Sequence, residues 1–316
     1  MEPILAVEDL EVYYKSIYGD VKSVDGVSFS VNPREIFGIA GESGCGKSTL
    51  VEGVLRVIAT PGYIKTGKIL YKNTDLLSLG DEELRKLRWR ELSYIPQGSM
   101  NSLNPVLRVE EQMVDAITSH SDIPKEEARE MAIARLKEVG LPVEVARMYP
   151  HELSGGMKQR VIIGTAILLK PSLVVADEPV TALDVVVQKG VLQSIANLRD
   201  NYGIAVIFVA HDLAAHAEIV DRLAIMYAGK IAETGSVYNI FEDPLHPYTQ
   251  LLVAAIPSIE KEVVEGIPGL APSPLNWPSG CRFHPRCPHA MPICSTEEPP
   301  LEEVRKDRYV ACHLYR

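Results

Sequence analysis

The sequence predicts an α/β protein with a parallel-sheet core, an antiparallel β subdomain at its N-terminus, a helical subdomain and a small cysteine-rich C-terminal extension. Two observations predict the core. Apolar strands alternate with helices in the second half of the chain, and a strand, a glycine-rich loop and a helix follow one another near residue 40. A third observation separates the extension from the rest, because four of the five cysteines lie in the last 36 residues.

The N-terminal part reads as strands. Residues 4–40 alternate apolar and polar side chains, turn near Gly19, and end in the fully apolar strand 36–40. The glycine-rich loop follows at once, and residues 47–58 then carry apolar side chains at helical spacing. We therefore expect the order strand, loop, helix at the centre of the fold.

The middle of the chain is helical, and the alternation of strand and helix resumes after it. Helical patterns fill residues 109–169, which predicts a helical subdomain over about residues 98–170. Strands and helices are then expected in turn at 173–176, 185–199, 204–210, 213–219 and 223–227. Prolines recur from residue 257 to 278, so we expect a main domain at 1–256 and a Pro-rich linker with a C-terminal segment at 257–316.

Charge and hydropathy exclude two classes of protein. The net charge of −10 disfavours general binding to nucleic acid, which needs a dense basic face. The longest apolar runs are much shorter than the ~18 residues that span a bilayer, and the N-terminus carries no signal-peptide pattern. These features predict a cytosolic chain with no membrane span of its own.

The glycine-rich loop has the pattern of a phosphate site. Residues 41–49 match G-x-x-x-x-G-K-[ST] between a buried strand and a helix: Gly41, Glu42, Ser43, Gly44, Cys45, Gly46, Lys47, Ser48 and Thr49. Glycines let backbone N–H groups converge on phosphate oxygens, and the helix N-terminus adds a favourable dipole. Lys47 is expected to reach the β- and γ-phosphates and Ser48 to bind Mg²⁺. Cys45 is expected to be a small residue that fits, with a redox-sensing thiol as the alternative.

Two carboxylates form a second phosphate-site element. Asp177 and Glu178 follow the apolar strand 173–176, and ligands bind at such strand ends in parallel sheets. Asp177 is expected to orient Mg²⁺ or its waters, and Glu178 to polarise the attacking water as general base.

The string Leu153-Ser154-Gly155-Gly156-Met157-Lys158-Gln159 resembles the signature motif of ABC ATPases, which few other P-loop proteins contain. Ser154 can cap the following helix, whose N-terminus, with Gly155 and Gly156, offers a second anion site. The resemblance implies that this element meets the γ-phosphate of ATP bound to a partner subunit. Hydrolysis would then need two nucleotide-binding subunits face to face.

Other elements of the family stand in the expected order over roughly the first 256 residues. Gln97 resembles the Q-loop glutamine, which senses the attacking water and Mg²⁺. Asp184 resembles the D-loop aspartate, and His211 the switch histidine that contacts the γ-phosphate. Tyr14 resembles the aromatic residue that stacks on adenine, with Tyr13 as the alternative, because adjacent side chains of a strand point to opposite faces.

Several strings resemble the ATPase subunits of dipeptide and oligopeptide importers, notably residues 101–105 and 246–249. Closely similar subunits import nickel or oligosaccharides, and those substrates stay open as alternatives. A soluble ABC ATPase of translation or DNA repair is disfavoured, since such chains carry two ATPase units or a long coiled-coil insertion. An iron–sulfur redox protein that uses nucleotide only for regulation is disfavoured as well, because no flavin or dinucleotide fingerprint is present.

The C-terminal cysteines suggest a cluster. Their spacing, C-x5-C-x6-C-x17-C, is wider than the pairs that structural zinc usually prefers. The resembling subunits carry a [4Fe–4S] cluster in this segment, so the resemblance implies that its ligands are Cys281, Cys287, Cys294 and Cys312, with Zn²⁺ as the second choice. Such a cluster would organise a tail that has too few apolar residues to fold by itself.

The resemblance also implies the working assembly. Two ATP molecules would bind between this chain and a homologous ATPase subunit, in a heterodimer as in most peptide importers of this kind, with a homodimer as the open alternative. Two transmembrane permease subunits and, indirectly, an extracellular substrate-binding protein would complete the importer. The chain would then sit peripherally at the cytoplasmic face of the cell membrane.

Overall fold

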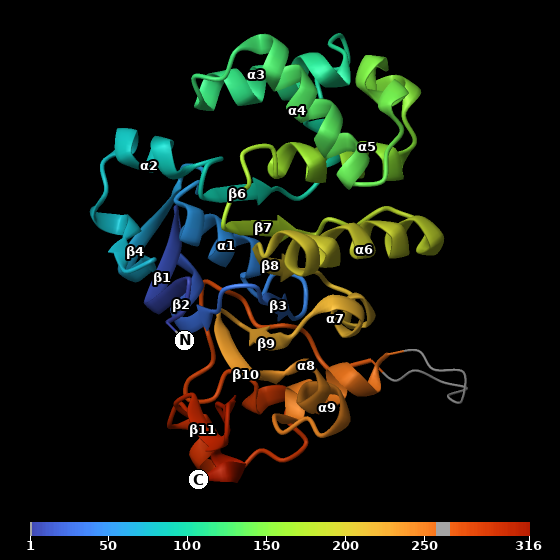
Figure 1. The fold of residues 1–316 in the computed structure, drawn as a ribbon. Helices are drawn as coiled ribbons and strands as arrows, with labels where there is room; N and C mark the ends of the chain where they lie inside the picture. The colour runs from blue at the N-terminus through green and yellow to red at the C-terminus, as the bar shows by residue number, and fades with distance from the viewer. Residues whose placement is uncertain (1, 257–265) are drawn as a thin grey trace. The chain divides into compact units, whose positions relative to one another are not determined.

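A computed structural model describes residues 2–256 and 266–316 (Figure 1). The chain divides into two compact units that interleave in sequence. The first unit comprises Met1–Ile4, Asn32–Ile36 and Ser78–Ala210, and the second comprises Leu5–Val31, Phe37–Leu77 and His211–Arg316. The predicted linker falls partly on residues 257–265, which lie outside the described residues.

The second unit begins with an antiparallel sheet, as the alternating N-terminal pattern predicts. Its strands lie in the order β2-β1-β4-β5. Their bounds are β1 Leu5–Ser16, β2 Gly19–Val31, β4 Gly62–Tyr71 and β5 Thr74–Asp75. Leu10, Val12 and Val24 are fully buried, so one face of this sheet belongs to the hydrophobic core.

The same unit contains the strand that leads into the glycine-rich loop. This strand, β3 (Ile36–Ala40), is buried throughout and runs parallel to β9 (Arg222–Tyr227). Strand β9 then pairs antiparallel with β10 (Lys230–Ser236). The last strands of the chain, β12 (Arg308–Val310) and β11 (Glu302–Arg305), extend this sheet, since β12 pairs with β10 and β11 with β12. The helices of the unit are α1 Lys47–Leu55, α7 Leu213–Ile219, α8 Val237–Glu242 and α9 Pro247–Ala254.

The first unit contains three neighbouring parallel strands, which confirms the parallel-sheet expectation for this part of the chain. Strand β7 (Leu173–Asp177) lies between β6 (Leu92–Ile95) and β8 (Ala205–Val209). Every residue of β7 and β8 is buried, because parallel strands are covered on both faces. Two helices of this unit are α2 Asp81–Leu87 and α6 Val185–Tyr202.

Helices fill the middle of the first unit, drawn in green in Figure 1. They are α3 Val109–His120, α4 Lys125–Glu138 and α5 Gly155–Ala166, and each packs on the other two. Met113, Ile117, Ala132 and Leu136 are fully buried where they meet. Short 3₁₀ turns connect elements in both units, at Leu76–Ser78, Ser99–Asn101, Val143–Arg147, Pro150–Glu152, His284–Arg286, Pro292–Ser295 and His313–Tyr315.

Some elements differ from the sequence expectations for local reasons. Helix α1 ends at Leu55 rather than Ile58, because Arg56 adopts a left-handed conformation with φ 54°. The sequence does not predict strand β4, in which Lys65, Thr66 and Gly67 interrupt the apolar residues. Strands β11 and β12 are short: β12 pairs with the distant strand β10, and β11 pairs with β12.

Candidate functional site

The glycine-rich loop joins β3 to α1 and depends on glycine at its two ends. Gly41 and Gly46 have φ values of 152° and 106°. A Cβ at Gly46 would lie 2.2 Å from the carbonyl oxygen of Ser23, and one at Gly41 would lie 2.1 Å from that of Met226. Only glycine allows this close passage of backbones. The loop therefore delivers the N-terminus of α1, the kind of terminus that binds phosphate.

Lys47 lies inside the loop, with only 4% of its surface exposed. Its ammonium group donates hydrogen bonds to the carbonyl oxygens of Gly41 at 2.7 Å and Glu42 at 3.1 Å. The same nitrogen lies 3.3 Å from Nδ1 of His211, directly before α7. The structure thus brings together two predicted site residues that are 164 positions apart in the sequence.

The two tyrosines proposed for adenine stacking have different surroundings. Tyr13 is 2% exposed, and its hydroxyl donates to Asp25. Burial, followed by the hydrogen bond to Asp25, raises the pKa of Tyr13. Tyr14 is half-buried, and its hydroxyl lies 3.2 Å from Oγ1 of Thr49 in the glycine-rich loop. Tyr14 is therefore the tyrosine that contacts the loop.

Asp177 and Glu178 stand at the carboxyl end of β7. Asp177 is fully buried, and Glu178 is 6% exposed with a left-handed φ of 50°. Oε2 of Glu178 accepts hydrogen bonds from Nε2 of Gln97 at 2.7 Å and from the hydroxyl of Thr181 at 3.3 Å. Gln97 follows β6, the parallel neighbour of β7. A glutamine and a carboxylate from adjacent strand ends thus meet, as expected for a group that orients water.

Ser154 and Asp184 cap two helices that pack on each other. The hydroxyl of Ser154 accepts from the backbone N–H of Met157 at 3.3 Å and begins α5. The carboxylate of Asp184 accepts from the backbone N–H of Val187 at 3.0 Å and begins α6. A Cβ at Gly156 would lie 2.3 Å from the Val187 side chain, so that glycine allows the two helix starts to approach closely.

The prediction of a [4Fe–4S] cluster at Cys281, Cys287, Cys294 and Cys312 is wrong, and so is the zinc alternative. Among residues 2–256 and 266–316, no group of three or more His, Cys, Asp or Glu side chains is arranged to hold a metal ion. Burial raises the pKa of Cys281 to about 11 and also raises the pKa values of Cys287 and Cys312. Burial therefore disfavours the thiolate form of these three side chains.

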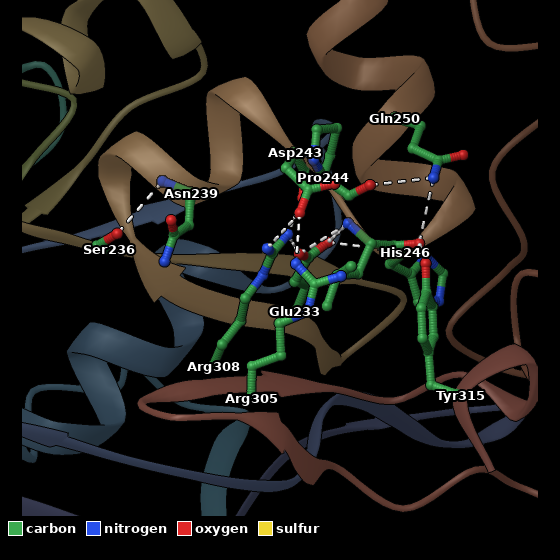
Figure 2. Close-up of polar contacts among 11 residues, drawn as sticks. Glu233, Ser236, Asn239, Asp243, Pro244, His246, Gln250, Arg305, Arg308 and Tyr315 are labelled. Atoms are coloured by element: carbon green, nitrogen blue, oxygen red, sulfur yellow. Dashed lines mark hydrogen bonds and ion pairs between the residues drawn. The ribbon is translucent and has the colours of Figure 1, made fainter.

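Ion pairs hold the C-terminal extension instead, and the sequence reasoning missed them. Arg308, 2% exposed at its side chain, pairs at 3.2 Å with the fully buried carboxylate of Glu233. Figure 2 shows the two side chains pointing toward each other, with Asp243 beside them. The backbone N–H groups of Leu245 and His246 also donate to Glu233, at 3.0 and 2.8 Å. Arg308 of β12 is thus joined to β10 by an ion pair as well as by strand pairing.

No helix in the part of the chain that the structure describes is both long and apolar enough to cross a membrane.

Comparison with known proteins agrees with this geometry. The ABC transporter family model matches residues 24–181, half of the chain, and a model of the C-terminal region of oligopeptide/dipeptide transporters matches residues 232–294. A dimeric bacterial ABC transporter cassette has a TM-score of 0.66 at 26% identity, over 74% of this chain and 98% of the other. A post-hydrolysis dimer of the same cassette, bound to ADP and phosphate, gives the same values. Fold and site together define an ATPase of the ABC type.

Three curated relatives narrow this class. The dipeptide transport ATP-binding protein DppD of Caldanaerobacter subterraneus subsp. tengcongensis is 42% identical, over 100% of this chain and 98% of the relative. The oligopeptide transport ATP-binding protein OppD of Bacillus subtilis is 41% identical over 98% and 88%, and that of Escherichia coli 42% identical over 98% and 93%. The chain belongs to the family of ATP-binding subunits of dipeptide and oligopeptide ABC transporters.

Proposed function

We propose that this chain is the ATP-hydrolysing subunit that powers an ABC importer for dipeptides or oligopeptides. Its membership of the transport ATPase family supports ATP hydrolysis, and the names of its relatives support peptides as the cargo. The observation that carries the hydrolytic step is the 2.7 Å hydrogen bond between Gln97 and Glu178. It holds a carboxylate oxygen at the end of a parallel strand, where a general base is required.

The glycine-rich loop is the proposed site of the ATP phosphates. Two glycines with positive φ, the N-terminus of α1 and the buried ammonium of Lys47 fit a triphosphate chemically. We assign the phosphates to Gly41, Ser43, Gly44, Cys45, Gly46, Lys47, Ser48 and Thr49. Tyr14, whose hydroxyl contacts this loop, is the proposed stacking partner of adenine.

The remaining site residues receive distinct proposed roles. Ser48, Gln97 and Asp177 offer the oxygen ligands that Mg²⁺ prefers, and the bound ion would neutralise charge on the phosphate oxygens. Glu178 acts as general base and His211 contacts the γ-phosphate. The element of Ser154, Gly155, Gly156 and Asp184 serves the nucleotide of a partner subunit. Support comes from the start of α5, whose neutral cap and following glycines leave backbone N–H groups for an anion.

ATPase subunits of peptide importers work with membrane permease subunits. We propose two permeases for this chain, a homologous ATPase subunit in a heterodimer, and an extracellular binding protein that delivers the peptide. The chain would then lie peripherally on the cytoplasmic face of the membrane. The boundary between a nucleotide-binding domain at 1–256, with a helical subdomain at about 98–170, and a C-terminal segment at 257–316 also stays a proposal.

Glu178→Gln tests the hydrolytic role. The amide keeps the shape of the side chain but cannot take a proton from water, so we expect ATP turnover of the assembled transporter to fall by about 10²- to 10⁴-fold. ATP binding should persist and trap a closed dimer. Phosphate release measures the turnover, and size-exclusion chromatography with ATP measures the dimer. The matched control is Glu218→Gln, at an exposed position on α7; near-normal turnover by Glu178→Gln would remove Glu178 from its role.

A further inference from the structure

An arginine of the C-terminal extension is bonded to the glycine-rich loop. Arg286 donates from Nη1 to Oε2 of Glu42 at 2.7 Å and from Nη2 to Oε1 at 2.9 Å. Its Nε donates to the carbonyl oxygen of Pro268 at 2.8 Å, so all three guanidinium nitrogens are used. The Arg286 side chain is 6% exposed and that of Glu42 25%. Bidentate pairing at low exposure makes this one of the stronger kinds of ion pair.

Phe283 directly precedes the 3₁₀ turn His284–Arg286 and fixes the position of this turn. Phe283 is 1% exposed, and its ring centroid lies 5.2 Å from that of Tyr227 and 5.4 Å from that of Tyr248. Tyr227 also accepts a hydrogen bond from Nη1 of Arg286 at 3.3 Å. The extension therefore presents Arg286 from a packed aromatic cluster rather than from a loose loop.

Glu42 is the second residue of the phosphate loop and is held at each of its polar groups. Arg286 holds its carboxylate, the hydroxyl of Tyr248 accepts from its backbone N–H at 2.9 Å, and Lys47 donates to its carbonyl oxygen at 3.1 Å. The hydrogen bond with Glu42 is the largest cause that raises the pKa of Arg286, so the guanidinium keeps its charge at neutral pH. A loop fixed in this way loses less conformational entropy when it binds a ligand.

A second arginine, just before this turn, forms an ion pair with the N-terminal sheet. Arg282 pairs with Asp25, which also accepts from the hydroxyl of Tyr13. Burial alone would raise the pKa of Asp25, but the hydrogen bonds from Tyr13 and Arg282 outweigh it and lower the pKa. Arg282 thus anchors the turn beside the strand of Tyr14, while Arg286 anchors it to the phosphate loop.

We propose that Arg286 is a positioning residue for the ATP site: through Glu42 it holds the phosphate loop in its binding conformation, so that the C-terminal extension sets the affinity for ATP. This inference rests on the proposed role of residues 41–49 as the phosphate site. Coupling is reciprocal, so bound ATP protects residues 281–287 in return.

Titration of the full-length chain with MgATP by calorimetry tests the inference. We expect Arg286→Ala to raise the Kd for MgATP roughly 5- to 30-fold, which lies within the range of coupling between directly bonded residues. Arg286→Lys keeps the positive charge but loses the bidentate hydrogen bonds of the guanidinium group. Its Kd for MgATP should lie between those of the wild type and Arg286→Ala. Arg305→Ala is the matched control, because Arg305 forms an exposed ion pair in the same extension, and its Kd should equal that of the wild type.

Two further measurements separate positioning from simple loss of stability. In the assembled transporter, Arg286→Ala should raise KM for ATP and leave kcat nearly unchanged. The double variant Glu42→Ala with Arg286→Ala should bind no more weakly than Glu42→Ala alone. MgATP should slow hydrogen exchange over residues 281–287 in the wild type, and Glu42→Ala should abolish that protection.

Lys47→Ala distinguishes this inference from the function on which it rests. If Lys47→Ala binds MgATP as the wild type does, the assignment of the phosphate site fails, and the inference fails with it. If Lys47→Ala loses binding while Arg286→Ala keeps the wild-type Kd and KM, only the positioning role of Arg286 is overturned. Should Arg286→Ala not fold, Arg286→Lys and Glu42→Gln decide by the same criteria.

Discussion

The Gly41–Thr49 loop and the C-terminal extension, residues 281–316, belong to the same compact unit but are held in different ways. The loop is shaped by neighbouring backbone and by its own lysine. The backbone of Gly46 packs closely against the carbonyl oxygen of Ser23, and the ammonium group of Lys47 donates a hydrogen bond to the carbonyl oxygen of Gly41. Distant charges and rings hold the extension, including Arg308 on Glu233 and Phe283 among tyrosines.

This contrast explains why the motif predicted the order strand, loop and helix around the loop, whereas the cysteine pattern of the extension misled. A phosphate loop requires glycines and a lysine at fixed spacing, so its sequence describes its geometry. Four cysteines in a short tail are compatible with a cluster, but the side chains that organise the tail are arginines whose partners lie elsewhere in the chain. A local pattern therefore identified the loop and misidentified the extension.

The largest expected effect is at the anchor of the extension. Arg308→Ala leaves the buried carboxylate of Glu233 without its cation, and breaking such a pair costs about 3–5 kcal/mol. We expect the lower end of this range, because two backbone N–H groups still donate to Glu233. Urea unfolding at neutral pH measures the change in the free energy of unfolding.

Arg305→Ala is the control for this anchor, since Arg305 pairs with Asp243 at the surface, with both side chains more than half exposed. Solvent screens that pair, so its loss should change stability far less. Equal losses for Arg308→Ala and Arg305→Ala would contradict the idea that buried charge holds the extension.

Acid should weaken the packing beside both regions, because one buried histidine lies close to each. Burial lowers the pKa of His216, next to Gly38 of β3, and of His246, next to Phe283, to about 4 from an ordinary 6.5. In the unfolded chain these two imidazoles bind protons below about pH 6.5, whereas in the folded chain they bind them only near pH 4. Stability should fall over this window, by about 2 kcal/mol per histidine between pH 7.5 and pH 5.

His246→Asn sharpens this prediction. Nδ1 of His246 accepts from the backbone N–H of Tyr248 at 3.0 Å and caps α9, and asparagine can accept the same hydrogen bond without titrating. The variant should lose about half of the acid sensitivity in urea unfolding, whereas His151→Gln, at an exposed histidine, should lose none. An unchanged pH dependence in His246→Asn would show that this histidine is not the titrating group.

The smallest expected effect lies at a purely local contact. Ser154→Ala removes the cap of α5 and should cost about 1 kcal/mol of stability, while Ser154→Asn should restore it. Chemical unfolding of both variants measures the cap alone. Because the proposed role of Ser154 concerns the nucleotide of a partner subunit, Ser154→Asn should still lose ATPase activity in the assembled transporter. Full activity in that variant would reduce Ser154 to a capping residue.

The sequence by itself determined the fold class and most of the strands and helices around the site. Buried strands, amphipathic helices and a glycine loop depend on the periodicity and backbone freedom of neighbouring residues, which are local properties. The cap at Ser154 was predictable for the same reason. Strands β11 and β12 were not, because each is too short to show a pattern: β12 depends on pairing with the distant strand β10, and β11 depends on pairing with β12.

Only the tertiary structure decided which charges meet. Arg286 and Glu42 are 244 positions apart and Arg308 and Glu233 are 75 apart, and nothing in the residues beside them indicates the partner. The contact of Lys47 with His211 and that of Gln97 with Glu178 likewise appear only once the chain has folded. Pairing of charged groups depends on position in space and on burial, and one-dimensional spacing encodes neither.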